Sequence, residues 1–178
     1  MARGPARTQG SRRNARPAGA HRPGTQRRSH VTLVVDATVL VAALVDSGPE
    51  GRWAESAVAE GPLIAPELLP ADVANILRGL EEAGEISRVE ANGALAGLSR
   101  LDLELAPFAP FADRIWALRT EVTSYDAWYV AVAEAFDCPL VTLDRSLLHA
   151  SGPECEIVVP YADGSERVRL LDRQSGHP

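Results

Sequence analysis

Four aspartates stand where they could act together on one ligand: Asp36, Asp72, Asp126 and Asp144. Asp36 directly follows the apolar run Val31–Val35, and Asp144 follows the apolar run Leu140–Leu143. In sheets of parallel strands, ligands bind beyond the carboxyl ends of the strands, which is where an acid after a strand lies. Acids also follow strands in ordinary loops, so neither Asp36 nor Asp144 indicates a site by itself.

The other two acids fall on predicted helices, at the edge of the apolar face. At about 100° per residue, Asp72 lies roughly 40° from Ile76 and roughly 60° from Leu69. Asp126 borders the apolar face of its own helix, which we assign to Tyr125, Tyr129, Val132, Ala133 and Phe136. Either acid could simply complement the helix dipole, an effect of about 0.3–1 kcal/mol. That explanation suits Asp126 better than Asp72, whose neighbours direct it toward the core, where an unpaired carboxylate is costly.

A cluster of carboxylates favours a hard divalent cation, because the cation relieves the repulsion between the negative charges. Mg²⁺ and Mn²⁺ prefer oxygen ligands, and Mg²⁺ usually retains several waters. Near a phosphodiester, such an ion activates water and stabilises charge on the attacking and leaving oxygens. The four acids therefore predict phosphoryl chemistry rather than acyl transfer.

Composition excludes several other classes of protein. The 178 residues include no lysine, since all 18 basic residues are arginines, and a phosphate-binding P-loop requires lysine. Response-regulator receivers and haloacid-dehalogenase-type phosphatases need one as well. The two cysteines, Cys138 and Cys155, support neither a disulfide framework nor a cysteine-based zinc site. Every apolar run is too short to span a bilayer, so a cytoplasmic protein is expected.

Charge divides the chain at residue 30. Residues 1–30 hold eight arginines and no acid, whereas the remainder holds ten arginines and all 24 acids, a net charge of −14. The first segment has no apolar periodicity, and we predict that it is a disordered basic extension. It could be a nucleic-acid-binding arm, an organelle-targeting peptide or the product of a gene start assigned too far upstream. The last is our first choice; a peptide from residues 1–30 in the mass spectrum of the native protein would contradict it.

From Val31 onward, short apolar strands alternate with amphipathic helices, which predicts an α/β fold with a mainly parallel sheet flanked by helices. We place one domain at residues 31–160 and a loose polar tail at 161–178. Expected strands are Val31–Val35, Leu103–Ala106, Leu140–Leu143 and Glu156–Val159. Expected helices are Ala37–Val45, Gly51–Glu60, Pro66–Ala83, Ile86–Leu101, Ala109–Val122 and Tyr125–Phe136, with Gly84 as a stop and Ser124 as an N-cap.

The segments around the four acids resemble those of PIN-domain nucleases. The opening Val34-Val35-Asp36-Ala37-Thr38 looks like that family's first strand and acid, and Thr142-Leu143-Asp144 looks like its fourth acidic turn. The two intervening segments, Pro66–Arg78 and Ser124–Glu134, are similar to its second and third acidic helices. The resemblance runs from Val31 to Val159 in the family's order and spacing, and the nearest branch is that of the VapC-type toxins.

This resemblance implies a PIN-like three-layer sandwich with the activity of an Mg²⁺- or Mn²⁺-dependent endoribonuclease. It also implies a homodimeric toxin of a type II toxin–antitoxin pair, held by a VapB-type antitoxin. The implied metal ligands and catalytic residues are Asp36, Asp72, Asp126 and Asp144; the supporting residues are Thr38, Asn75 and Thr142; candidate RNA contacts are Arg78, Arg119 and Arg145. One departure is that the family usually has Glu where this chain has Asp72, which shortens the reach by about 1.5 Å.

Two alternatives remain at this stage. The fold could be kept while the chemistry is lost, giving a catalytically weak or inactive binding module, and the shorter Asp72 favours that view. The chain could instead be a nuclease of DNA or of structured RNA without an antitoxin. A small overlapping upstream gene would favour the toxin. We assign Trp53, Trp116 and Trp128 to the core or an interface, and His149 to a loop.

Overall fold

The computed structural model describes residue 1, residues 32–160 and residues 166–169. Apart from Met1, the predicted disordered extension 1–30 lies outside the described residues. A six-stranded sheet has the order β3-β2-β1-β4-β5-β6. Its strands are β1 Leu33–Val35, β2 Leu63–Pro66, β3 Leu103–Ala106, β4 Leu140–Val141, β5 Ile157–Pro160 and β6 Glu166–Arg169. The first five are parallel and β6 is antiparallel to β5, which confirms the predicted fold class.

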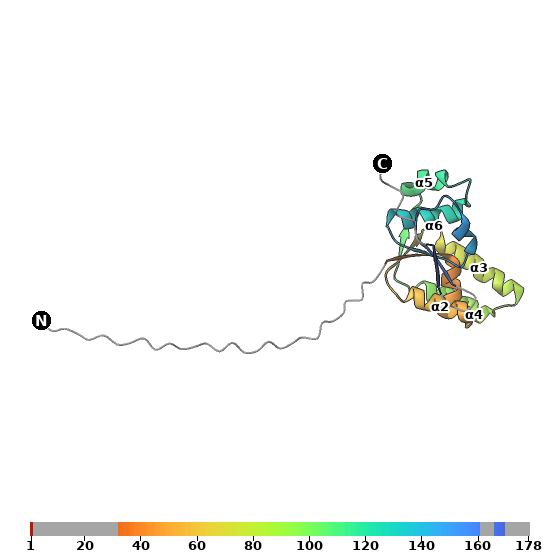
Figure 1. Cartoon of the computed structure of the whole chain (residues 1–178). Helices are drawn as coiled ribbons and strands as arrows, with labels where there is room; N and C mark the ends of the chain where they lie inside the picture. The colour runs from red at the N-terminus through yellow and green to blue at the C-terminus, as the bar shows by residue number, and fades with distance from the viewer. Residues whose placement is uncertain (2–31, 161–165, 170–178) are drawn as a thin grey trace.

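Helices cover both faces of this sheet. They are α1 Ala37–Val45, α2 Pro49–Val58, α3 Leu69–Ala83, α4 Arg88–Leu98, α5 Ala112–Ala117 and α6 Ser124–Ala135, with the 3-10 turns η1 Ala109–Phe111 and η2 Arg145–His149. Helix α6 packs on β1, β2 and β4 and carries α5 on its outer side, whereas α1 packs on α2, α3 and α4. Figure 1 shows α5 and α6 on one side of the sheet and α2 and α4 on the other. None of the helices in the described part of the chain is long and apolar enough to cross a membrane.

The core explains why the central strands are continuous apolar runs. Strand β1 is buried at all three positions, and Val34 and Val35 pair with Leu140 and Val141 of β4. A strand covered by helices on both faces has no solvent side, so alternation of polar and apolar residues disappears. The same condition holds for β2, which is buried at all four positions.

Three parts of the sequence-based assignment were wrong. Leu63, Ile64 and Ala65 were assigned to no element and Pro66 to the start of a helix, whereas Leu63–Pro66 is the buried strand β2. Residues 166–169 were placed in a loose tail and form β6. The predicted helix Ala109–Val122 is broken into η1 and α5, and residues 118–122 form turns before α6. The last difference matters for function, because those turns lie beside the acidic residues.

Candidate active site

Four separate elements bring the aspartates to one end of the sheet. Asp36 follows β1 and Asp144 lies three residues beyond the end of β4, and these two strands are adjacent and parallel. Asp72 lies in the first turn of α3 and Asp126 in the first turn of α6. Electrostatic coupling links Asp36 to both helix acids, and links Asp126 to Asp144 and Asp72. All four side chains are partly exposed, so a ligand can reach them.

Asp36 is held by two threonine hydroxyls. Thr142 donates to Asp36 Oδ2 at 2.6 Å, and Thr38 donates to the same oxygen at 2.9 Å. Thr142 is completely buried, so its hydroxyl has a fixed direction. Because both donors engage Oδ2, the carboxylate is locked in one rotamer, and Oδ1 remains available for a ligand.

The same threonines tie the turn after β4 to β1. Thr142 Oγ1 accepts from the Asp144 N–H at 3.0 Å, and Thr38 Oγ1 accepts from the Leu143 N–H at 3.3 Å. The Asp144 carboxylate in turn caps η2, accepting from the Ser146 N–H at 2.8 Å. The positions of Asp36 and Asp144 are therefore coupled through Thr142.

Asp126 is oriented by the residue that caps its helix. Thr123, and not the expected Ser124, is the N-cap of α6: its hydroxyl donates to Asp126 Oδ2 at 2.6 Å and accepts from the Asp126 N–H at 3.2 Å. Burial raises the pKa of Asp126 above 3.8, the Thr123 hydrogen bond opposes the shift, and the charges of Asp144 and Asp36 raise it further. Ionising Asp126 in the folded protein therefore costs more free energy than ionising an aspartate in water.

Asp72 has one partner from across the sheet. The Tyr129 hydroxyl lies 3.4 Å from Asp72 Oδ2, a long hydrogen bond, and also accepts from the backbone N–H of Ala37. Burial raises the pKa of Asp72, the hydrogen bond to Tyr129 lowers it, and the charges of Asp36 and Asp126 raise it. Burial and the nearby acids also raise the pKa of Tyr129, which keeps this hydroxyl a donor.

This donor set fits a hard divalent cation. The ligands on offer are carboxylate oxygens. Burial is the main cause that raises the pKa of Asp72 and Asp126, and the repulsion between the acids, which such a cation relieves, raises it further. Within the described ranges, no three acidic, histidine or cysteine side chains meet as a ready-made metal cage. Mg²⁺ retains several waters and needs few direct protein ligands.

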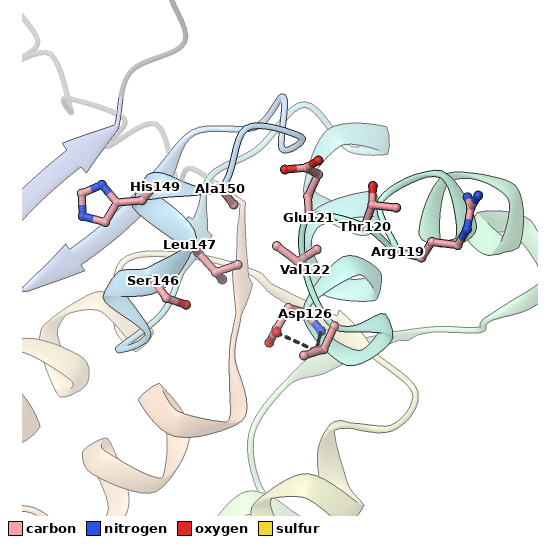
Figure 2. A pocket seen from close by; sticks show the side chains of 10 residues that line it. Arg119, Thr120, Glu121, Val122, Asp126, Ser146, Leu147, His149 and Ala150 are labelled. Atoms are coloured by element: carbon pink, nitrogen blue, oxygen red, sulfur yellow. Dashed lines mark hydrogen bonds between the residues drawn. The ribbon is translucent and has the colours of Figure 1, made fainter.

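A cleft of about 630 Å³ opens beside Asp126. Figure 2 shows η2 on one side, the 119–122 turns on the other, and Asp126 at the base. Its lining comprises Arg119, Thr120, Glu121, Val122, Thr123, Asp126, Ser146, Leu147, His149 and Ala150. The cleft thus joins the acidic site to a surface that an extended substrate could occupy.

The remaining candidates differ in their surroundings. Asn75 is exposed on α3, three residues after Asp72. Arg78 pairs with Glu82 at 2.7 Å and Arg145 pairs with Glu50 at 3.1 Å. Their charges are therefore partly neutralised, and an RNA phosphate would compete with a carboxylate for either one.

Arg119 is different, because it has no carboxylate partner among the described residues. It donates to the Trp116 carbonyl oxygen at 2.8 Å, and its guanidinium lies 4.7 Å from the centre of the Trp116 ring. Trp116 was assigned to the core or an interface; its exposed fraction of 65% rules out the core, and the interface stays a prediction. Trp53 is buried and Trp128 half-buried, as expected for core aromatics.

Sequence reasoning missed two residues of this site. Thr123 stands three positions before Asp126, the spacing of a helix-capping pair, and that signal was available. Tyr129 stands three positions after Asp126 and therefore shares its helix face. Its aromatic ring suggested only core packing, so the direction of its hydroxyl could not be inferred without the fold.

Comparison with known proteins places this geometry in context. The sequence model of the PIN domain matches residues 33–153. Ribonuclease VapC1 of Mycobacterium tuberculosis is 41% identical over 125 residues, covering 70% of this chain and 94% of that protein. VapC ribonuclease Mb0985 of Mycobacterium bovis is 35% identical over 127 residues, covering 71% and 97%.

Solved structures agree on the fold. PAE2754 from Pyrobaculum aerophilum aligns with a TM-score of 0.52 and 27% identity, over 75% of this chain and 87% of that one. VapBC2 from Rickettsia felis, solved bound to a DNA fragment from its promoter, aligns with a TM-score of 0.50 over 71% of this chain and 98% of that one. Its identity of 16% supports a shared fold alone.

Proposed function

Because the chain belongs to the PIN-domain family, and within it to the VapC proteins, we propose that it is an endoribonuclease that acts as the toxin of a toxin–antitoxin pair. The observation that carries the proposal is the convergence of Asp36, Asp72, Asp126 and Asp144 from four separate elements. The VapC relatives support the choice of RNA as substrate, because they are named ribonucleases and this chain matches nearly the whole length of each.

We further propose that the site works with Mg²⁺ or Mn²⁺, held by Asp36, Asp126 and Asp144 directly or through waters on the metal, with Asp72 at its edge. Such an ion supplies an activated water and stabilises charge on the phosphate. The protein's own part is orientation. Thr38 and Thr142 lock Asp36, Thr123 locks Asp126, and the link through Thr142 keeps Asp144 in register with Asp36.

The proposed partners follow from the same family membership. We propose a homodimer, acting in the cytoplasm, that is neutralised by a VapB-type antitoxin covering the acidic site. A body with a charge of −14 outside residues 1–30 repels RNA at long range. The bound cation and unpaired arginines such as Arg119 would offset that repulsion locally.

The test is cleavage of single-stranded RNA with Mg²⁺ or Mn²⁺ by the wild type, Asp36→Asn and Asp126→Asn. Asp113→Asn is the matched control, because Asp113 also lies in the first turn of a helix, α5, and is exposed. We expect Asp36→Asn and Asp126→Asn each to lower the cleavage rate by roughly 100-fold or more, the scale of losing one preorganised charged group. Asp113→Asn should cleave as the wild type does.

Equal cleavage by all four proteins would rule out the proposed site. Absence of cleavage in the wild type, with binding of Mn²⁺ intact, would favour the inactive binding module. Cleavage of DNA in preference to RNA would overturn the assignment as a ribonuclease.

A further inference from the structure

The cleft beside Asp126 lies next to the acids, and the proposed metal site does not use most of it. It is continuous with the acidic site, because Asp126 lines both. Its volume of about 630 Å³ lies within the range of small-molecule sites, which is about 300–1,000 Å³. A polymer whose phosphate lies at the acids must continue in some direction, and this cleft offers an open one.

The lining combines apolar side chains with hydroxyls. Val122 contributes from the turns before α6 and Leu147 from η2, on opposite walls, while Thr120 and Ser146 add hydroxyl groups. Apolar side chains can pack against the face of a nucleobase, and hydroxyls can donate to or accept from its edge. Such a lining accepts a flat, partly polar group.

Charge distinguishes one rim of the cleft. Arg119 has no carboxylate within ion-pair distance in the described part of the chain, whereas Arg78 and Arg145 each have one. Its guanidinium is fixed by the Trp116 ring and carbonyl, and in Figure 2 it extends away from Asp126. A fixed, unpaired cation at this rim suits a phosphate one or more nucleotides away from the acids.

We propose that this cleft binds a nucleotide that flanks the scissile bond of single-stranded RNA. The base lies between Val122 and Leu147, and a neighbouring phosphate contacts Arg119 on its Trp116 support. Glu121, whose carboxylate accepts from Ser151 at the mouth of the cleft, repels phosphate there and favours the Arg119 end. The inference rests on the proposed ribonuclease function and adds to it the residues that set the preference for the base next to the cut.

Binding is measured first, in the full-length Asp36→Asn background, so that the result does not depend on cleavage. The anisotropy of labelled single-stranded RNA is followed over a salt series for Arg119→Gln, Val122→Phe and the control Arg88→Gln. Arg88 is an exposed arginine of α4, paired with Glu81. Thermal unfolding of each variant checks that the fold is kept.

Arg119→Gln removes one phosphate contact. The plot of the logarithm of the RNA association constant against the logarithm of the salt concentration should therefore become less steep by about 0.7. Filling the cleft in Val122→Phe should weaken binding by roughly 10-fold, the scale of one lost base contact. The control should change neither quantity. In the active background, Val122→Phe should also alter the preferred base beside the cut.

Unchanged slope and affinity in both cleft variants would overturn the proposal. A change in the dimer–monomer equilibrium of Arg119→Gln at unchanged RNA affinity would assign this surface to protein association and would overturn it as well. If the wild type binds RNA with the predicted dependence on Arg119 but does not cleave it, the cleft stands and the proposed nuclease activity fails.

Discussion

At the scale of single residues, the hydroxyl groups give the site its geometry. Thr142 joins Asp36 to the Asp144 turn, Thr123 fixes Asp126, and Tyr129 contacts Asp72. Outer contacts of this kind orient metal ligands, and their loss typically costs about 10–100-fold in metal affinity or activity. The orientation of the four carboxylates therefore depends on these hydroxyl groups.

Tyr129→Phe tests this at the residue that the sequence did not reveal. The ring is 4% exposed and stays packed, but Asp72 loses its donor and the Ala37 N–H loses its acceptor. We expect the Mn²⁺ concentration for half-maximal cleavage to rise roughly 10-fold. Tyr125→Phe is the control, because Tyr125 lies on the same helix and is 62% exposed. An unchanged Mn²⁺ requirement in Tyr129→Phe would assign the hydroxyl a purely structural role.

The acidic residues of the site could be predicted from the sequence, but the directions in which several side chains point could not. The positions of Asp36 and Asp144 follow from the apolar runs before them, because a strand buried on both faces cannot continue through an unpaired charge. The exposure of Trp116 could not be foreseen, because its helix α5 has only six residues and shows no apolar period. Tyr125 was placed on the buried face of α6 and is exposed, because it lies at the open N-terminal end of that helix.

At the scale of elements, the bounds of α1 and the end of α3 were predicted correctly. Ala37–Val45 has the predicted bounds of α1, and Gly84 ends α3 with a φ of 74°, a conformation that glycine adopts without strain. Strand β2 was missed because four apolar residues are too few to show a period, and Pro66 resembled the start of a helix. A missed central strand leaves the sheet order unknown, so the convergence of the four acids required the structure.

The start of α2 depends on one close approach of the backbone. Asp46 accepts from the N–H groups of Gly48 at 2.7 Å and Gly51 at 2.9 Å, and a Cβ at Gly51 would lie 1.8 Å from the Asp46 carbonyl oxygen. Gly51→Ala should lower the free energy of unfolding by roughly 1–3 kcal/mol, because the helix must shift.

Gly79→Ala on α3 is the matched control for that experiment. An added Cβ there meets nothing within 4 Å, so the substitution should stabilise the protein by roughly 0.5–1 kcal/mol through helix propensity. Urea unfolding of both variants measures the two free energies. Equal stability of Gly51→Ala and the wild type would show that α2 tolerates a side chain at this position.

At the scale of the whole molecule, the fold gathers four aspartates that form no ion pair with an arginine of the described residues. The folded-state pKa values of Asp72 and Asp126 lie above the 3.8 of an ordinary aspartate, first because of burial and then because of the other acids. A carboxyl group whose pKa is raised on folding contributes stability to the folded state below about pH 3.8. That stability is lost as the pH rises through the raised pKa values. Near neutral pH the charged carboxylates therefore lower the free energy of unfolding, and a bound cation raises it again.

Relief of this repulsion by a bound cation is measured by the thermal unfolding midpoint at neutral pH, with and without Mn²⁺, of the wild type and Asp126→Asn. Without metal, Asp126→Asn should unfold at a higher temperature, because one repelling charge is gone. At about 100 times its dissociation constant, Mn²⁺ should stabilise the wild type by about 2.7 kcal/mol and raise its midpoint by several degrees. It should shift Asp126→Asn far less. Equal Mn²⁺ shifts in both proteins, or none in the wild type, would contradict a metal site built from these four aspartates.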